Sequence, residues 1–262
     1  MGVDAGDFDD DGDEDVFVTN LSGEGHDLYV NDGSGAFENR SAASGLNYPS
    51  LPFTGFGTAW LDVDNDGRLD ILTVNGTVQR IDALVRASDP HPLRQRKQLF
   101  HNLGNGHFGD LTDRAGAVFQ HLDVGRGAAF GDIDNDGDTD VIVGNNNGPA
   151  QVLFNVVGNR NHWIGLRLAG RAGSAGQVGP KGGVRDMLGA RVAIVRQGQP
   201  TRWRRARADG SFASANDPRV LVGLGASSEL PRVRVTWPDG QVEEWKSVPI
   251  DRYSTLVEGS SK

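Results

Sequence analysis

Three stretches of the chain are near copies of one another: GDFDDDGDEDVFV at 6–18, LDVDNDGRLDILT at 61–73 and GDIDNDGDTDVIV at 131–143. Each carries the pattern D-x-D-x-D-G-x-x-D, followed directly by apolar residues that are mostly β-branched. A second apolar and aromatic run ending in Asn follows each copy, within 27–39, 98–110 and 151–159. The first Asp of successive copies are 55 and 70 residues apart. Loop, strand, turn and strand therefore recur as a tandem supersecondary repeat.

The aspartates of each copy suit a hard cation, because Ca²⁺ takes about six to eight oxygen ligands from carboxylates and carbonyls. Asp at loop positions 1, 3 and 5 can converge on one ion, and position 9 offers a fourth carboxylate. Position 7 offers a backbone carbonyl, for which the side chain is irrelevant. The predicted metal-binding residues are Asp7, Asp9, Asp11, Asp13 and Asp15; Asp62, Asp64, Asp66, Arg68 and Asp70; and Asp132, Asp134, Asp136, Asp138 and Asp140. We expect about three structural Ca²⁺ ions, since Mg²⁺ prefers to keep bound waters.

Turn-forming residues favour the same loop. Gly at position 6 permits a sharp turn, and Asp or Asn at position 4 tolerates turn conformations. A helix–loop–helix calcium site would need Glu at position 12 and flanking helices. The segments that follow these loops, VFVTN, ILTVN and VIVGN, instead predict strands. The residues are Gly12, Gly67 and Gly137 at position 6, Asp10, Asn65 and Asn135 at position 4, and Val18, Thr73 and Val143 at position 12.

A single D-x-D-G tract is usually an ordinary solvated turn, and that is the alternative to a metal site. Three copies in one register, each with four aspartates, argue against it. Without a cation the carboxylates of one tight loop would repel one another.

The repeat region resembles FG-GAP/VCBS repeats, the blades of integrin-α-type β-propellers. The resemblance rests on the acidic loops, on the lead-in GFGTAWLD at 55–62 and on the turn NDGSGAF at 31–37. LGARV at 188–192, LVGLG at 221–225 and VTWPDG at 235–240 resemble the ASPIC/UnbV domain that follows such repeats in the cartilage acidic protein family. The resemblance implies an all-β chain, with a partial β-propeller at 1–157 and a small β-rich C-terminal domain at 158–262. It also implies a calcium-binding, secreted or cell-surface protein of the adhesion class.

Residues 1–157 hold only two to three blades, whereas propellers typically need about four to eight. We therefore expect an incomplete ring, in a portion of a longer protein or in a short relative that closes by association. An unclosed ring exposes strand edges, which invites pairing with another chain. No signal peptide is expected in a sequence that begins inside a repeat. We favour an extracellular or cell-surface location, because extracellular modules bind calcium with dissociation constants of about 10⁻⁴–10⁻³ M and such sites would be filled outside cells but empty inside them.

Charge is divided unevenly along the chain. Residues 1–157 hold 26 acidic and 9 basic side chains, a net charge of −17, and residues 158–262 hold 9 acidic and 17 basic, a net charge of +8. The densest basic cluster is RWRRAR, Arg202–Arg207. We expect a solvated strand face there, with acidic glycans, phosphate or the acidic repeats as alternative partners. No nucleic-acid-binding motif accompanies it.

The C-terminal part predicts strands throughout. RVRVTW at 232–237 alternates, and a P-D-G turn leads to QVEEW at 241–245, so a hairpin with Val233, Val235 and Trp237 facing inward is expected. Trp163, Trp237 and Trp245 are expected in the core. Between repeats, residues 77–97 carry Ile81, Leu84 and Val85 at helical spacing, which predicts a short helix or a loop insertion.

The sequence offers no catalytic constellation. Its six His show no catalytic or zinc spacing, and His101 and His107 are expected to be surface turn residues. Cys is absent, and no apolar run approaches the roughly 18 residues of a membrane-spanning helix. The predicted function is a calcium-binding interaction scaffold for an unidentified protein or glycan. An enzyme or accessory protein of a biosynthetic, natural-product type pathway, and a purely structural assembly module, are the alternatives.

Overall fold

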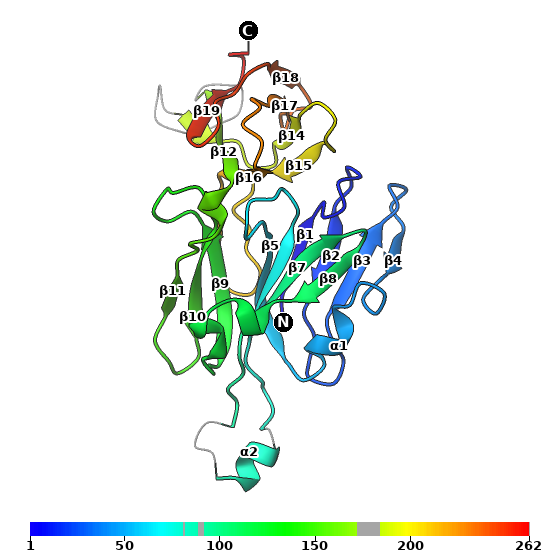
Figure 1. Ribbon diagram of the computed structural model, residues 1–262, viewed down its shortest axis with the longest axis vertical. Helices are drawn as coiled ribbons and strands as arrows, with labels where there is room; N and C mark the ends of the chain where they lie inside the picture. The colour runs from blue at the N-terminus through cyan, green and yellow to red at the C-terminus, as the bar shows by residue number, and fades with distance from the viewer. Residues whose placement is uncertain (81, 89–91, 172–183, 262) are drawn as a thin grey trace.

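Three antiparallel sheets follow one another along the repeat region (Figure 1). The computed structural model describes residues 1–80, 82–88, 92–171 and 184–261. Within each sheet the strands pair in chain order, and we call the sheets blades 1, 2 and 3. Blade 1 contains β1 (Val3–Gly6), β2 (Asp15–Val18), β3 (Asp27–Asn31) and β4 (Phe37–Asn39); blade 2 contains β5 (Gly55–Leu61), β6 (Asp70–Asn75), β7 (Gln98–Gly104) and β8 (His107–Asp110); blade 3 contains β9 (Gly125–Gly131), β10 (Asp140–Asn145) and β11 (Gln151–Leu153).

The blades stack through alternate residues of each strand, because successive side chains of a strand point to opposite faces. Ile71 of β6 belongs to the core between blades 1 and 2, and the next residue, Leu72, belongs to the core between blades 2 and 3. Aromatic rings fill the first core, where Phe8 stacks on Trp60 with centroids 5.4 Å apart. Burial of each such side chain contributes about 1.5–3 kcal/mol. The described residues form no closed ring, so the predicted partial propeller is confirmed.

Two four-stranded sheets make up the C-terminal region, around one apolar core. The predicted hairpin is present, and Val233, Val235 and Trp237 are buried as expected. Trp163 is buried too, and Trp245 packs partly buried against the core. One sheet contains β12 (His162–Arg171), β13 (Val184–Asp186), β16 (Val220–Gly225) and β19 (Tyr253–Val257); the other contains β14 (Arg191–Val195), β15 (Arg202–Arg205), β17 (Arg232–Thr236) and β18 (Val242–Trp245).

The helices of the described residues are short: α1 (Asn47–Ser50), α2 (Asp82–Arg86) and the 3₁₀ turns Thr112–Arg114, Ala117–Gln120 and Gly158–Arg160. Helix α2 lies within the segment 77–97, where a short helix or a loop insertion was predicted. It projects from the end of the molecule opposite the C-terminal sheets (Figure 1). Ile81 lies outside the described residues. No described helix combines the length and the apolarity needed to cross a membrane.

Candidate metal centres and their junction with the C-terminal region

Each acidic loop leaves the innermost strand of its blade and enters the second strand. The backbone takes a left-handed conformation at position 4, with φ of 66° at Asp10, 56° at Asn65 and 62° at Asn135. It does so again at position 6, where φ is 99° at Gly12, 94° at Gly67 and 97° at Gly137. The predicted turn residues therefore sit where positive φ is required, and the three loops share one backbone path.

The carboxylate at position 1 folds back over its own loop. Oδ2 of this Asp accepts a hydrogen bond from the amide of the Gly at position 6 in all three loops. The distances are 3.1 Å for Asp7 and Gly12, 2.8 Å for Asp62 and Gly67, and 3.0 Å for Asp132 and Gly137. Position 1 is buried in each loop, so this bond holds an acidic group inside the protein.

The carboxylate at position 9 joins the loop to the third strand of its blade. Asp70 accepts hydrogen bonds from the amides of Val63 at 3.0 Å and Asn102 at 2.7 Å. Asp15 is bonded in the same way by Phe8 and Asn31, and Asp140 by Ile133 and Asn155. The side chain of the Asn that ends the second element also bonds to an acidic loop, because its Nδ2 donates to the carbonyl oxygen of Glu14 from Asn31, of Leu69 from Asn102 and of Val63 from Asn155.

Carboxylate oxygens of each loop converge within 4.8 Å of one another, in groups that could hold a cation. These groups are Asp7, Asp9 and Asp15; Asp62, Asp64 and Asp66; Asp132, Asp134 and Asp136. Asp11, Asp13 and Asp140 lie outside such groups, and Asp138 instead accepts a hydrogen bond from the amide of Asn159 at 3.3 Å.

The donor set of these groups fits Ca²⁺, since it consists of oxygens alone in the three loop clusters. Oδ1 of Asp7 is buried and has no hydrogen-bond partner among the described residues. An acceptor left unpaired in this way is costly, and a bound cation would satisfy it.

Burial and mutual repulsion raise the pKa values of the loop carboxylates. Burial raises the pKa of Asp7 to about 6 and that of Asp15 to about 7, and nearby Asp9 and Asp11 add to both shifts. Burial, with help from Asp70 and Asp66, holds the pKa of Asp62 well above its usual range. A carboxyl whose pKa is raised to about 7, such as that of Asp15, is protonated in about half of the molecules at neutral pH unless a cation takes the place of the proton.

Blade 2 departs from its neighbours through His101. Its Nδ1 lies 3.0 Å from Oδ1 of Asp70, and this hydrogen bond raises the pKa of the imidazole. The prediction that His101 is a surface turn residue is therefore wrong, because the ring is only 21% exposed and joins Asp64 and Asp70 in a further group. His107 is exposed, as expected. Arg68 also carries a role that sequence reasoning missed, since its guanidinium pairs with Asp66.

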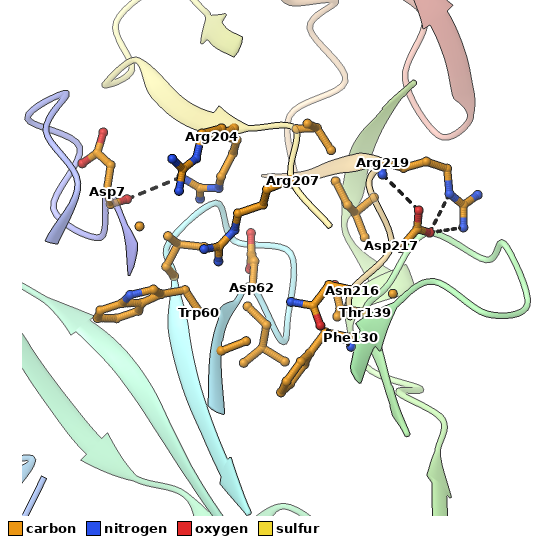
Figure 2. A pocket seen from close by; sticks show the side chains of 18 of the residues that line it. Asp7, Trp60, Asp62, Phe130, Thr139, Arg204, Arg207, Asn216, Asp217 and Arg219 are labelled. Carbon is orange, nitrogen blue, oxygen red and sulfur yellow. Dashed lines mark hydrogen bonds and ion pairs between the residues drawn. The ribbon is translucent and has the colours of Figure 1, made fainter. Parts of the chain in front are cut away.

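The basic cluster Arg202–Arg207 contacts the acidic repeats, so the expectation of a solvated strand face is wrong (Figure 2). Arg202 pairs with Asp10, and both side chains are about nine-tenths buried. Arg205 lies 3.3 Å from Glu14, and Arg207 lies 2.6 Å from Asp4. Arg204 Nη2 donates to the carbonyl oxygen of Gly67 at 3.0 Å. The uneven charge of the two halves of the chain was the signal for this junction.

The third loop meets the C-terminal region through two other residues. Arg219 donates to the carbonyl oxygen of Asp132 at 2.7 Å and to Oδ1 of Asn135 at 2.6 Å. The hydroxyl of Tyr253 donates to Oδ2 of Asp132 at 2.8 Å. The guanidinium of Arg219 also lies over the Tyr253 ring, 4.1 Å from its centroid. The C-terminal region therefore contacts all three acidic loops.

A segment of the C-terminal region, Ser211–Asp217, also lies along the innermost strands of the blades. The amide of Val3 donates to Ser211 Oγ at 3.1 Å, and the amide of Asp217 donates to the carbonyl oxygen of Phe130 at 2.9 Å. A polar cavity of about 140 Å³ remains at the junction (Figure 2). Its lining mixes arginines of the C-terminal region with aspartates of the loops, so its charges are largely paired.

Tandem antiparallel blades, each with an acidic loop between its first two strands, define a propeller-type repeat protein. The chain belongs to the FG-GAP-like repeat family, whose model matches residues 7–73 and 80–143. A second family model, ASPIC and UnbV, matches residues 179–262. Both resemblances drawn from the sequence are thereby confirmed.

The curated relatives include cartilage acidic protein 1 of three vertebrates, each 24% identical to this chain. The match covers 93% of the chain and 42% of the Mus musculus protein, and 87% of the chain and 39% of the Homo sapiens protein. For Xenopus tropicalis the shares are 87% and 40%. The chain thus spans about two fifths of the length of these relatives.

Proposed function

We propose that the chain is a calcium-binding, extracellular or cell-surface repeat protein that acts as an adhesion-type scaffold for a protein or glycan ligand. The observation that carries the proposal is the convergence of carboxylates in three equivalent loops, each around a buried Asp at position 1. Among the described residues, Oδ1 of Asp7 has no hydrogen-bond partner. The proposed ligands remain the fifteen loop residues predicted from the sequence, with carbonyls at Asp13, Arg68 and Asp138.

Three Ca²⁺ ions would lower the negative charge of residues 1–157 from −17 to −11. Each ion would displace bound protons and attract the carboxylates of its loop, which otherwise repel one another. The ordered loop would then stay in contact with the arginines of the C-terminal region. A site at a hundredfold excess of calcium over its dissociation constant adds about 2.7 kcal/mol to the free energy of unfolding. Calcium would therefore stabilise both the blades and their junction with the C-terminal region.

The proposed role is binding rather than catalysis. The loop carboxylates are committed to hydrogen bonds and to the proposed ions, so they leave no open position for a substrate. A pathway accessory protein or enzyme is the second candidate, and the polar cavity at the junction is the place where it would act. We divide the chain into a repeat domain at 1–157 and a C-terminal domain at 158–262, since every sheet lies wholly on one side of that boundary.

Calorimetric titration with calcium, with thermal melting in calcium and in chelator, tests the proposal. We expect near three ions per chain and a melting temperature that falls sharply in chelator. Asp62→Asn should remove one ion from the count, and Asp32→Asn, at an exposed turn outside the loops, should remove none. Absence of binding at millimolar calcium, with unchanged melting, would contradict the metal sites.

A further inference from the structure

The chain that follows the repeat Asn takes a different path in blade 3 than in blades 1 and 2. In blade 2 it turns into β8, which pairs with β7, and in blade 1 it turns into β4, which pairs with β3. In blade 3, residues 155–161 instead run from β11 to β12 through the 3₁₀ turn Gly158–Arg160. We call residues 155–161 the strap, and they contact the second and third acidic loops together.

Two asparagines of the strap bond to carboxylates of the third loop. The amide of Asn155 donates to Oδ1 of Asp140 at 2.9 Å. Asn159 donates from its side chain to Oδ2 of Asp136 at 2.5 Å, and from its amide to Oδ2 of Asp138 at 3.3 Å. Asp136 and Asp140 are proposed calcium ligands at positions 5 and 9. The strap therefore bonds directly to side chains that would hold the ion.

The same strap holds the second loop by its backbone. Nδ2 of Asn155 donates to the carbonyl oxygen of Val63 at 2.7 Å, and Nδ2 of Asn161 donates to that of Asp64 at 2.8 Å. Val63 and Asp64 are positions 2 and 3 of the loop, and Asp64 is a proposed calcium ligand. Asn155 thus bonds to both loops, through its amide to the third and through its side chain to the second.

The two loops also contact each other. Asn65, which is fully buried at position 4 of the second loop, donates from Nδ2 to the carbonyl oxygen of Gly137 at 2.8 Å. Gly158 of the strap is buried against both loops, because a Cβ there would lie 2.6 Å from Cβ of Asp138 and 3.1 Å from the carbonyl oxygen of Val63. No free space separates the strap from either loop at this point, so displacement of one loop would displace the strap and the other loop.

We propose that the strap couples the second and third calcium sites, so that filling one site raises the affinity of the other. This coupling rests on the proposed function, because it concerns the metal sites named there. The carboxylates of a loop repel one another, so each loop must be ordered against that repulsion when it binds an ion. An ion in one loop orders the strap, and the second ion then binds to a loop that the strap already holds.

Charge opposes this coupling, because an ion in one loop weakens the negative potential that attracts an ion to the other. Salt screens the opposing effect, with a Debye length of about 8 Å at about 0.15 M ionic strength, whereas the strap acts through direct contact. We define the coupling factor as the ratio by which filling one site lowers the dissociation constant of the other. At this ionic strength we expect a factor of at least about five, the lower end of the range typical of linked sites.

Calorimetric titration of chains with disabled sites measures the coupling factor. Asp9→Asn, Asp64→Asn and Asp134→Asn each remove the position-3 carboxylate of one loop. Chains that keep one site give its own dissociation constant, and chains that keep two sites show whether the pair binds more tightly than the single values predict. We expect a factor of at least about five for the second and third loops, and a factor within about twofold of one for the first and third loops, whose blades each pack on blade 2.

Variants of the strap separate coupling from ion binding itself. Asn161→Ala removes a bond to the second loop but no carboxylate, so it should lower the coupling factor at least about twofold and leave the single-site dissociation constants unchanged. Asn65→Ala is a second uncoupling variant if the first lowers the melting temperature. Asn145→Ala is the matched control, since its Nδ2 donates to the carbonyl oxygen of Pro149 at 2.8 Å, at the end of β10 far from the third loop. It should keep the full coupling.

A coupling factor of one or less for the second and third loops would overturn the proposal. So would a factor that both Asn161→Ala and Asn65→Ala leave unchanged, because the bonds of the strap would then carry no coupling. The unaltered chain distinguishes the two levels of the proposal. Three bound ions without coupling would refute only the role of the strap, whereas absence of calcium binding would refute the metal sites themselves.

Discussion

Removal of one hydroxyl tests whether the C-terminal region stabilises an acidic loop. Tyr253 lies in β19, and its hydroxyl donates to Oδ2 of the buried Asp132 at 2.8 Å. In Tyr253→Phe the ring can keep its place beside Trp163, 5.3 Å away, and beneath Arg219. The variant therefore deletes a hydrogen bond without opening a cavity.

The size of the loss follows from the groups involved. A hydrogen bond to a charged group contributes about 1.5–3 kcal/mol to stability. Oδ2 of Asp132 keeps a second donor, the amide of Gly137 at 3.0 Å, so the carboxylate is not left unpaired. We therefore expect the lower end of the range, a loss of about 1.5 kcal/mol in the free energy of unfolding.

Urea unfolding at fixed, saturating calcium measures this loss, with an unchanged dependence on urea as the sign that the folded state is the same. Tyr48→Phe is the matched control, because Tyr48 is 83% exposed and should lose less than about 0.5 kcal/mol. A Tyr253→Phe loss no greater than that of the control would refute the reasoning, since the bond would then contribute nothing to the folded state.

Three further predictions concern backbone space and protonation. Gly137→Ala should lower the free energy of unfolding by about 3 kcal/mol or more, measured by urea unfolding, because a Cβ there would overlap the Trp163 ring. The control Gly35→Ala also has positive φ but has open space around it, so it should lower the free energy of unfolding by only about 1 kcal/mol. Burial lowers the pKa of His26 to about 4, so between about pH 6.5 and 4 the unfolded chain binds a proton that the folded chain does not, and the free energy of unfolding falls as the pH drops. The difference in the free energy of unfolding between the unaltered chain and His26→Gln should change by about 3 kcal/mol over that window. A constant difference would contradict the burial argument. The pKa of Asp15 is about 7, so calcium must displace a proton there, and calcium affinity should fall as the pH is lowered from 8 to 6. Calorimetry in buffers of different ionisation enthalpy should detect the released protons. A calcium affinity that does not depend on pH would contradict this coupling.

Much of the repeat region could be predicted because its signals are local. Alternation of apolar residues sets the strands, and the positions of Gly67 and Asn65 in the loop set its positive φ values. Each of these depends on a few neighbouring residues, and three copies in one register exclude coincidence. The hairpin that buries Val233 and Val235 was predictable for the same reason.

The tertiary structure alone decided which distant groups meet. The bond between Tyr253 and Asp132 joins residues 121 positions apart, and no local pattern encodes such a pairing. The sequence predicts that His101 is a turn residue, whereas the packing of β7 beside the second loop brings its imidazole within hydrogen-bond distance of Asp70. The arginines of 202–207 read as a solvated face, because sequence gives their charge but not the acidic surface they lie against. Local alternation thus determined the blades and loops, whereas docking of the C-terminal sheets, which satisfies many weak and distant contacts at once, determined the junction.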